Sequence, residues 1–326
     1  MLTTIPTDLI VCGELDDKLK IKREIYYDDK IQDENPKVKR DKMDRYICPH
    51  CAKGIARINN FHNHLKICKI KIMLENLADL KDRRYFKEYE AKPGNRLELF
   101  FHFNPGKQLK MYMSGQSGVG KSHLIAQLMK EYVRRYEDRR VIMFSQVPQD
   151  KDIDDVVEEH ELIERELFFR VDLNLFSQID PKTRKVNKSI PIPTMEQFKR
   201  SLCIFDDIDK IPNKIILKNI DDLKNEILAT GRDHTYQGDD IDIIVSNHQI
   251  LGGVRTSEIL QQSNFVVLFP QGLSSHGIKT TCMKYLGMEP EQIKRILSLD
   301  APHQYAIVHR DSPSFVLEQR KIWLIK

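Results

Sequence analysis

The residues with the clearest chemistry form the stretch GQSGVGKS, which begins at Gly115 and ends at Ser122. The spacing Gly-x4-Gly-Lys-Ser is typical of a phosphate-binding loop, because its glycines let successive backbone N–H groups close around a β-phosphate. Lys121 would reach the β- and γ-phosphates, and the Ser122 hydroxyl would ligate Mg2+. An apolar run precedes the loop and helical spacing follows it, so the phosphates would lie at a helix N-terminus. The sequence therefore predicts a site for ATP and Mg2+, whose loop residues are Gly115, Gln116, Ser117, Gly118, Val119, Gly120, Lys121 and Ser122.

A pair of carboxylates follows a second apolar run, in the stretch SLCIFDDID at positions 201–209. In a phosphate-loop enzyme an acidic residue at the tip of a neighbouring buried strand holds Mg2+, and we assign this role to Asp206. A second carboxylate beside it can orient and deprotonate the attacking water, and we assign this role to Asp207. The alternative is that these residues cap the next helix, a role that also suits Asp209.

A further buried strand is predicted in DIDIIVSNHQ, and it ends in the polar residues Asn247, His248 and Gln249. A strand tip next to the strand that holds Mg2+ is where an amide would sense the terminal phosphate. The alternative is that these three residues simply begin a loop.

A separate set of residues has the spacing of metal ligands, Cys48-x2-Cys51-x12-His64-x3-Cys68. This is the spacing of a zinc finger with two cysteine and two histidine ligands, in which cysteine replaces the last histidine. A thiolate is an equally good tetrahedral ligand for Zn2+. His64 and Cys68 are four residues apart and would share one face of a helix, whereas His62 is a rival ligand. We therefore expect one Zn2+ per chain.

The segment around these ligands is basic. Residues 45–72 contain six lysines and arginines and no acidic residue. Such a patch neutralises phosphates, so nucleic-acid contact is one interpretation, and protein docking or a solvated basic face is the other. Since one finger reads only about three base pairs, we expect no sequence-specific targeting by this finger alone.

The composition describes a soluble chain of one large or two modest domains, with 326 residues, 40% of them hydrophobic, and a net charge of +4. No uncharged apolar run approaches the roughly 18 residues of a membrane span, and the first residues lack the apolar core of a signal peptide. We therefore expect a cytosol-like compartment and no membrane insertion. The six cysteines do not form the pattern of a disulfide framework.

The chain divides into three predicted parts. Residues 1–40 mix charges densely and are predicted to be a loosely ordered leader. Residues 41–90 would form the zinc finger and a linking helix, and residues 91–326 the nucleotide-binding domain. Strands and helices alternate in this last part, which predicts an α/β fold with a mostly parallel sheet and helices on both faces. The final stretch, QYAIVHRDSPSFVLEQRKIWLIK, is predicted to be a hairpin.

The stretches GQSGVGKS, CIFDDID, GRDH, IIVSNHQ and SPSFVL…IWLIK occur in the order found in viral genome-packaging ATPases. Residues 95–326 thereby resemble this branch of the FtsK-HerA group of DNA translocases, as in poxviruses and other large double-stranded DNA viruses. The resemblance implies a RecA-like P-loop NTPase fold and a sensor glutamine at Gln249. Asp233 interrupts the family's Gly-Arg-His, so the arginine finger is either Arg232 or Arg255. No arginine lies close to the phosphate loop and the acidic pair in sequence, which fits a finger supplied by another subunit.

The same resemblance implies partners and a location. It implies a homo-oligomeric ring with ATP between subunits, double-stranded DNA in its centre, and a capsid or portal-vertex protein as docking partner. The chain would work at the viral assembly site in the host cytoplasm or in the virion.

Two other functions compete with this one. An AAA+-type remodeller or loader with a zinc finger adaptor would need a helical lid where a strand pair is expected. A nucleotide-binding zinc finger scaffold without turnover would not need the adjacent carboxylates Asp206 and Asp207. A small-molecule kinase is disfavoured because no acceptor or lid segment is recognisable.

Overall fold

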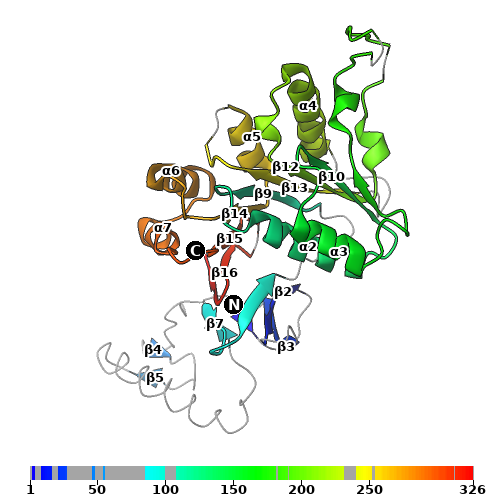
Figure 1. Cartoon of the computed structure of the whole chain (residues 1–326). Coiled ribbons are helices and arrows are strands. Elements are labelled where there is room, and N and C mark those ends of the chain that lie inside the picture. The colour runs from blue at the N-terminus through cyan, green and yellow to red at the C-terminus, as the bar shows by residue number, and fades with distance from the viewer. Residues whose placement is uncertain are drawn as a thin grey trace.

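The structure is a computed structural model that describes residues 2–3, 9–16, 21–27, 46–47, 54–55, 85–99, 108–180, 183–189, 191–230, 240–251, 254–311 and 313–325. Its largest element is a ten-stranded sheet with the strand order β11-β10-β12-β13-β9-β14-β15-β16-β17-β7 (Figure 1). The strands are β7 (Glu88–Glu90), β9 (Lys110–Ser114), β10 (Arg140–Ser145), β11 (Phe168–Arg170), β12 (Ser201–Asp206), β13 (Ile241–Asn247), β14 (Phe265–Leu268), β15 (Ala306–His309), β16 (Phe315–Glu318) and β17 (Lys321–Leu324).

The six strands from β11 to β14 run parallel, and the remaining four pair antiparallel. The predicted mostly parallel α/β sheet is therefore confirmed. Strand β13 lies between β9 and β12, so the strand that leads into the phosphate loop and the strand that ends in the acidic pair are not direct neighbours. Because parallel strands end at the same edge, the ends of β9, β12 and β13 still lie together.

Helices cover both faces of this sheet, as predicted. Alternate side chains of β9 point to opposite faces, so that Met111 and Met113 belong to one core and Tyr112 to the other. The first core also contains residues of α2 (Lys121–Arg135) and α3 (Lys151–Glu159). The second contains residues of α4 (Lys214–Thr230), α5 (Val254–Gln262), α6 (Ser275–Tyr285) and α7 (Pro290–Leu297). Short 3-10 turns occupy Leu173–Phe176, Met195–Phe198 and Ile208–Lys210.

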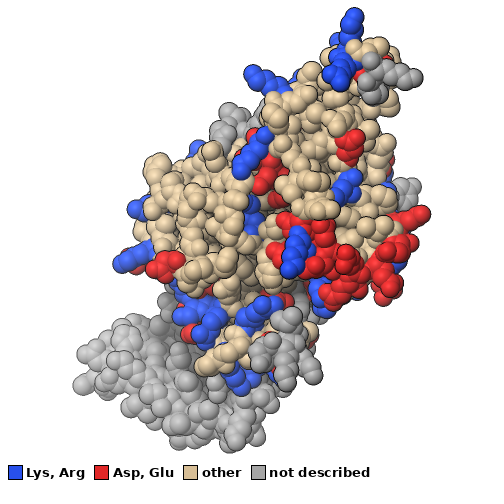
Figure 2. Space-filling view, viewed as in Figure 1, with Lys and Arg blue, Asp and Glu red and all other residues tan. Residues whose placement is uncertain are grey.

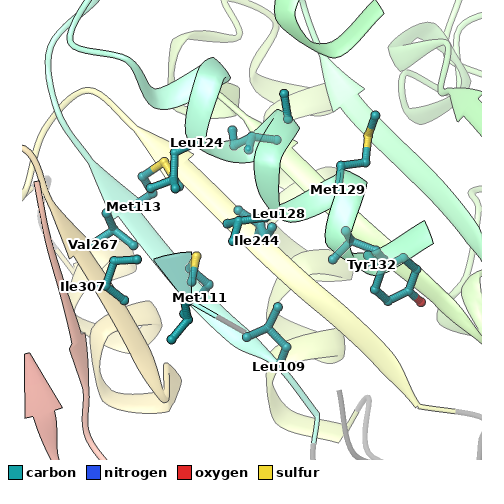
Figure 3. Packing of buried hydrophobic residues seen from close by; sticks show 14 of the residues in the cluster. Leu109, Met111, Met113, Leu124, Leu128, Met129, Tyr132, Ile244, Val267 and Ile307 are labelled. Atoms are coloured by element: carbon teal, nitrogen blue, oxygen red, sulfur yellow. The ribbon is translucent and has the colours of Figure 1, made fainter. Parts of the chain in front are cut away.

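The packing of α2 on the sheet fixes the element that follows the phosphate loop. Leu124, Leu128 and Tyr132 recur at four-residue spacing and lie on the face of α2 that contacts Met111 and Ile244 (Figure 3). Each such side chain contributes about 1.5–3 kcal/mol when it is fully buried. Because β9 and α2 are both anchored in this core, the loop between them is held at two ends.

A smaller five-stranded sheet has the order β6-β1-β3-β2-β8. Its strands are β1 (Leu2–Thr3), β2 (Leu9–Leu15), β3 (Ile21–Tyr27), β6 (Tyr85–Phe86) and β8 (Arg96–Leu99). The prediction of a loosely ordered leader is thus wrong for β2 and β3, where Val11, Cys12 and Ile25 are buried. The dense charges around these strands hid a short apolar run. The division into three parts otherwise stays a prediction.

The C-terminal stretch forms three antiparallel strands, β15, β16 and β17, rather than the predicted two-stranded hairpin. The extra turn comprises Gln319 and Arg320, which carry none of the usual glycine or asparagine turn signals. Farther towards the N-terminus, β4 (Tyr46–Ile47) and β5 (Gly54–Ile55) pair antiparallel. Within the described ranges, no helix combines the length and apolarity needed to cross a membrane.

The amino-terminal end of β13 buries a carboxylate, and this predicts a pH-dependent stability. Asp242 accepts a hydrogen bond from the Leu109 N–H at 2.7 Å and lies 3.9 Å from Nη1 of Arg139. Burial raises the pKa of Asp242 to about 7 from its ordinary 3.8, although both of these neighbours favour the charged form. The native state therefore binds this proton more tightly than the unfolded state, and the resulting stabilisation is lost as the pH rises from about 4 to 7.

We expect the free energy of unfolding of the wild type, relative to Asp242→Asn, to fall between pH 4 and pH 7 and then level off. Urea unfolding of both proteins at several pH values measures this difference. Parallel pH profiles would show that Asp242 is ionised throughout.

Candidate nucleotide site

The phosphate loop joins β9 to α2, and its glycines are required by geometry at both ends. A Cβ atom at Gly115 would lie 2.8 Å from atoms of Phe269 and Val119, closer than side chains tolerate. Gly120 has a φ of 103°, a left-handed conformation that favours glycine. The Gly115 N–H donates to the carbonyl of Asn247 at 3.2 Å, which ties the loop to the end of β13.

Lys121 lies inside this loop. Its side chain is only 7% exposed, and Nζ donates to the carbonyl oxygens of Gly115 at 2.7 Å and Gln116 at 3.2 Å. Burial lowers the pKa of Lys121, while the carboxylates Asp207 and Asp206 oppose that shift. The loop thus holds an ammonium group at the point where the sequence predicts phosphate binding.

The acidic pair lies directly across from Lys121. Asp206 ends β12 and is 7% exposed, and burial followed by the charge of Asp207 raises its pKa. Oδ1 of Asp207 lies 3.9 Å from Nζ of Lys121, is buried, and makes no hydrogen bond within the described part of the chain. Asp206 and Ser122 line the same cleft and supply the oxygen ligands that Mg2+ prefers, so these residues fit ATP and Mg2+.

The structure does not support the alternative that the acidic pair caps a helix. The Asp207 side chain makes no capping hydrogen bond to the 3-10 turn Ile208–Lys210. The cap of α4 is provided by Asn213 instead, whose Oδ1 accepts from the N–H groups of Ile215 and Ile216 at 2.9 and 3.3 Å. The Asp206 and Asp207 carboxylates therefore face the cleft.

At the end of β13, the structure brings His248 to the site rather than Gln249. Nε2 of His248 is hydrogen-bonded to Oδ2 of Asp207, and His248 lines the cleft. Gln249 is exposed and does not line the cleft, and its carbonyl accepts from the Tyr112 hydroxyl at 2.7 Å. It lines a neighbouring hollow of about 330 Å³, to which Asn247 and His248 also contribute. The sequence names all three residues of this polar tip but cannot tell which of them turns towards Asp207, since the backbone beyond a strand end decides this.

The cleft has a volume of about 1200 Å³ and a second wall that sequence reasoning also missed. This wall comes from β8, from the segment before β15 and from the turn between β16 and β17. It includes Arg96, His303, Tyr305 and Arg320. Folding thus brings two arginines of the same chain, Arg96 and Arg320, to the cleft of the phosphate loop, and neither is one of the two predicted finger residues.

The remaining predicted site residues are not placed. Cys48, Cys51, His64 and Cys68, the predicted Zn2+ ligands, and Arg232 lie outside the described residues. Arg255 belongs to the first turn of α5, but its side chain is not described. Within the described ranges, no group of three or more histidines, cysteines or carboxylates is arranged to hold a metal ion.

Comparisons with known proteins add the following. No protein-family model matches the chain. Uncharacterized protein V3 of Sputnik virophage is 27% identical over 216 residues, which cover 65% of this chain and 76% of that protein. The genome packaging NTPase B204 of Sulfolobus turreted icosahedral virus 2, in complex with ATP-gammaS, matches with a TM-score of 0.40 at 12% identity. The match covers 69% of this chain and 98% of the NTPase chain. EssC (ATPases 2 and 3) of Geobacillus thermodenitrificans matches with a TM-score of 0.40 at 14% identity. This match covers 72% of this chain and 43% of the EssC chain. At these TM-scores the likeness to the solved structures carries no conclusion about function.

Proposed function

We propose that the chain is an ATPase. The observation that carries this proposal is the convergence of Lys121, Asp206 and Asp207 on one cleft, from two strand ends that meet at the same edge of the sheet. A buried ammonium in a glycine loop neutralises phosphates, and a carboxylate beside the Mg2+ ligand accepts a proton from water.

Each residue has a defined role in this proposal. The loop N–H groups and Lys121 bind and orient the β- and γ-phosphates, and Ser122 and Asp206 hold Mg2+, which supplies positive charge to the phosphates when bound. Asp207 orients the water and takes its proton through the Oδ1 that makes no hydrogen bond within the described chain. His248 holds the other carboxylate oxygen and thereby fixes the direction of Oδ1.

We further propose that hydrolysis drives movement of double-stranded DNA in viral genome packaging, by a homo-oligomeric ring that docks on a capsid or portal-vertex protein. The order of the motifs in the sequence supports this, and the related Sputnik virophage protein agrees with a viral source. An AAA+-type remodeller is disfavoured, because the described chain after α7 forms strands that extend the sheet.

The surface charges favour one path for the DNA. The exposed side of α3 and the turn after it is acidic and would repel phosphates (Figure 2). Residues 177–180 and 183–189, between β11 and β12, form an arm, in which Ile179 and Val186 pair and the Asn187 N–H donates to the carbonyl of Gln178 at 2.7 Å. This arm exposes Arg184, Lys185 and Lys188, which suit phosphate contact.

The test is ATP turnover with and without double-stranded DNA, together with the mass of the particle in the presence of nucleotide. We expect DNA to stimulate turnover several-fold and nucleotide to favour the oligomer. If DNA does not change the turnover rate and the chain stays monomeric with nucleotide, the protein is an ATPase but not a translocase.

We also propose that residues 46–72 form a zinc finger with Cys48, Cys51, His64 and Cys68 as ligands. The described neighbours support this, because β4 and β5 pair antiparallel on either side of the segment that contains Cys48 and Cys51. DNA binding by the chain with and without the finger distinguishes the two possible partners of its basic residues. A loss of DNA binding without the finger would indicate DNA, and unchanged binding would indicate protein.

Purified protein is expected to contain one Zn2+ per chain, and Cys51→Ala is expected to lose it, because three ligands hold the ion far more weakly than four. The finger should unfold in this variant while the nucleotide-binding domain stays folded, since a module this small depends on its metal. Metal analysis and ATP binding measure the two effects. His50→Ala, in the same Cys48–Cys51 segment, is the matched control and should keep Zn2+. Protein purified without chelator that contains no zinc would contradict the site.

A further inference from the structure

We infer that the second wall of the cleft is a nucleoside subsite, in which Arg96, Arg320 and Tyr305 hold the base and ribose of the nucleotide. This inference rests on the proposed ATP site, because it concerns the other end of the same ligand. It assigns a binding function to the small sheet and to the C-terminal strands, which the motifs leave without one.

The arrangement of the sheet gives the cleft a direction. Strands β12 and β13, which carry Asp206, Asp207 and His248, lie on one side of β9. Strands β14, β15 and β16 lie on its other side. Since Nζ of Lys121 is 3.9 Å from Asp207, the terminal phosphates belong on the first side. A nucleotide bound that way extends its nucleoside end towards the second side.

A series of contacts connects the phosphate loop to the second wall. A Cβ atom at Gly120 would lie 3.5 Å from Nδ1 of His303, so this histidine borders the loop. The carbonyl of His303 accepts from Nε2 of Gln319 at 3.0 Å, and the carbonyl of Gln319 accepts from the Leu97 N–H at 2.7 Å. Arg320 and Arg96 are the chain neighbours of Gln319 and Leu97, and both line the cleft.

Both arginines retain donors for a ligand. The Arg320 side chain is 51% exposed, and its Nη2 makes one 3.4 Å hydrogen bond to the Ala91 carbonyl and lies 4.0 Å from Glu90. The Arg96 side chain is 41% exposed, and its hydrogen bond to Glu98 uses Nη2 alone in the described part of the chain, which leaves Nη1 for a ligand.

Arg295 shows how a purely structural arginine differs. Its guanidinium donates to both Glu88 and Glu318 and lies 4.7 Å over the ring of Trp323. A guanidinium with spare donors and an open face can instead stack on a base and donate to its edge or to the ribose.

The chemistry of this wall suits a nucleoside better than phosphates. Tyr305 and the edges of the buried residues Leu97 and Leu124 line the wall beside the two guanidinium groups, a mixture typical of small-molecule pockets. A hollow of about 480 Å³ continues from it between the small sheet and α2, lined by Leu15, Leu99 and Leu128. Glu98 next to Arg96 would disfavour an additional phosphate but not an uncharged base.

The test compares ligands with and without a nucleoside on the full-length chain. ATP, ADP and inorganic tripolyphosphate are titrated against the wild type, Arg96→Ala and Arg320→Ala. We expect each variant to bind ATP and ADP about tenfold more weakly, as for the loss of one good charged contact, and tripolyphosphate within about twofold of the wild type. In turnover, KM should rise and kcat should change by less than about twofold, because this contact is equal in the ground and transition states.

Arg200→Ala is the matched control, since Arg200 is also exposed and paired with one carboxylate, Asp138, but does not line the cleft. Arg320 lies in an exposed turn, so its variant keeps the test valid if Arg96→Ala fails to fold. An equal loss of tripolyphosphate binding would show that the arginines bind phosphates and would overturn the inference. Unchanged ATP and ADP affinities in Arg320→Ala would overturn it and leave the ATP site intact. A wild type that binds neither ATP nor tripolyphosphate would remove the proposed function itself.

Discussion

Lys121→Ala is expected to weaken ATP binding by about a hundredfold or more, whereas Asp207→Asn should keep ATP and Mg2+ and slow turnover. In the lysine variant, the buried charge that neutralises the β- and γ-phosphates is gone, so the defect appears already in the ground state. In the asparagine variant, the amide keeps the size of the side chain but cannot accept the proton of water. The expected loss in kcat is about 10²–10⁴-fold, the range for removing a general base.

Nucleotide titration and turnover on the same preparations separate these two effects. Asp209→Asn is the matched control, because Asp209 is an exposed carboxylate two residues farther along the chain and does not line the cleft. It should bind and hydrolyse ATP as the wild type does. A comparable loss of binding in Lys121→Ala and Asp207→Asn would mean that Asp207 is a Mg2+ ligand, and the division of the acidic pair would be wrong.

The site residues that could be predicted from the sequence are those whose positions depend only on a short stretch of chain. The glycines at 115 and 120 serve one turn, and the apolar run of β12 ends directly in Asp206. Local spacing is enough to place such residues on a strand end or a helix start. The mostly parallel sheet follows from the same alternation of buried strands with helices.

The parts that were missed depend on the course of the backbone over longer distances. His248 and Gln249 are adjacent polar residues, and only the turn after β13 determines which of them meets Asp207. Arg96 lies on β8 of the small sheet and Arg320 in the turn between β16 and β17 of the large one. The Leu97–Gln319 hydrogen bond joins the two segments, and no local pattern links them to Lys121. The strands β2 and β3 were missed because charged neighbours outnumber their few buried side chains.

An arginine supplied across a subunit boundary is expected to be essential for turnover. Charge develops on the γ-phosphate during hydrolysis, and in phosphate-loop NTPases a finger supplied in trans contributes about 10³–10⁵ in rate. Arg232 follows the end of α4 at Thr230, and Arg255 lies in the first turn of α5. Arg232 thus follows the helix that comes after the acidic pair, and Arg255 lies in the helix that comes after β13. Either position could supply an arginine to a neighbouring subunit. The alternative is that both are exposed arginines on surface loops with no phosphate to bind.

Subunit mixing tests this directly. A Lys121→Ala chain is inactive at its own site but would still offer its arginine to a neighbour. Mixed with Arg232→Ala or Arg255→Ala, whichever removes the finger, it should restore turnover at the sites that keep Lys121. A mixture of Lys121→Ala with Asp207→Asn is the matched control and should stay inactive, because both residues act within their own chain.

The mixing result also separates the two sources of positive charge at this cleft. If the Arg232 and Arg255 variants assemble, are inactive alone and are not rescued, the essential arginine acts in cis and the trans assignment fails. If both variants hydrolyse ATP normally, neither is the finger. Arg96 and Arg320, which line the cleft, would then be the arginines to test next, and tripolyphosphate binding by their variants would show whether they contact phosphates after all. Suppose instead that Lys121→Ala rescues one arginine variant and that Arg320→Ala keeps full tripolyphosphate binding. The neighbouring subunit would then supply the arginine that contacts the γ-phosphate, and the chain's own second wall would hold the nucleoside.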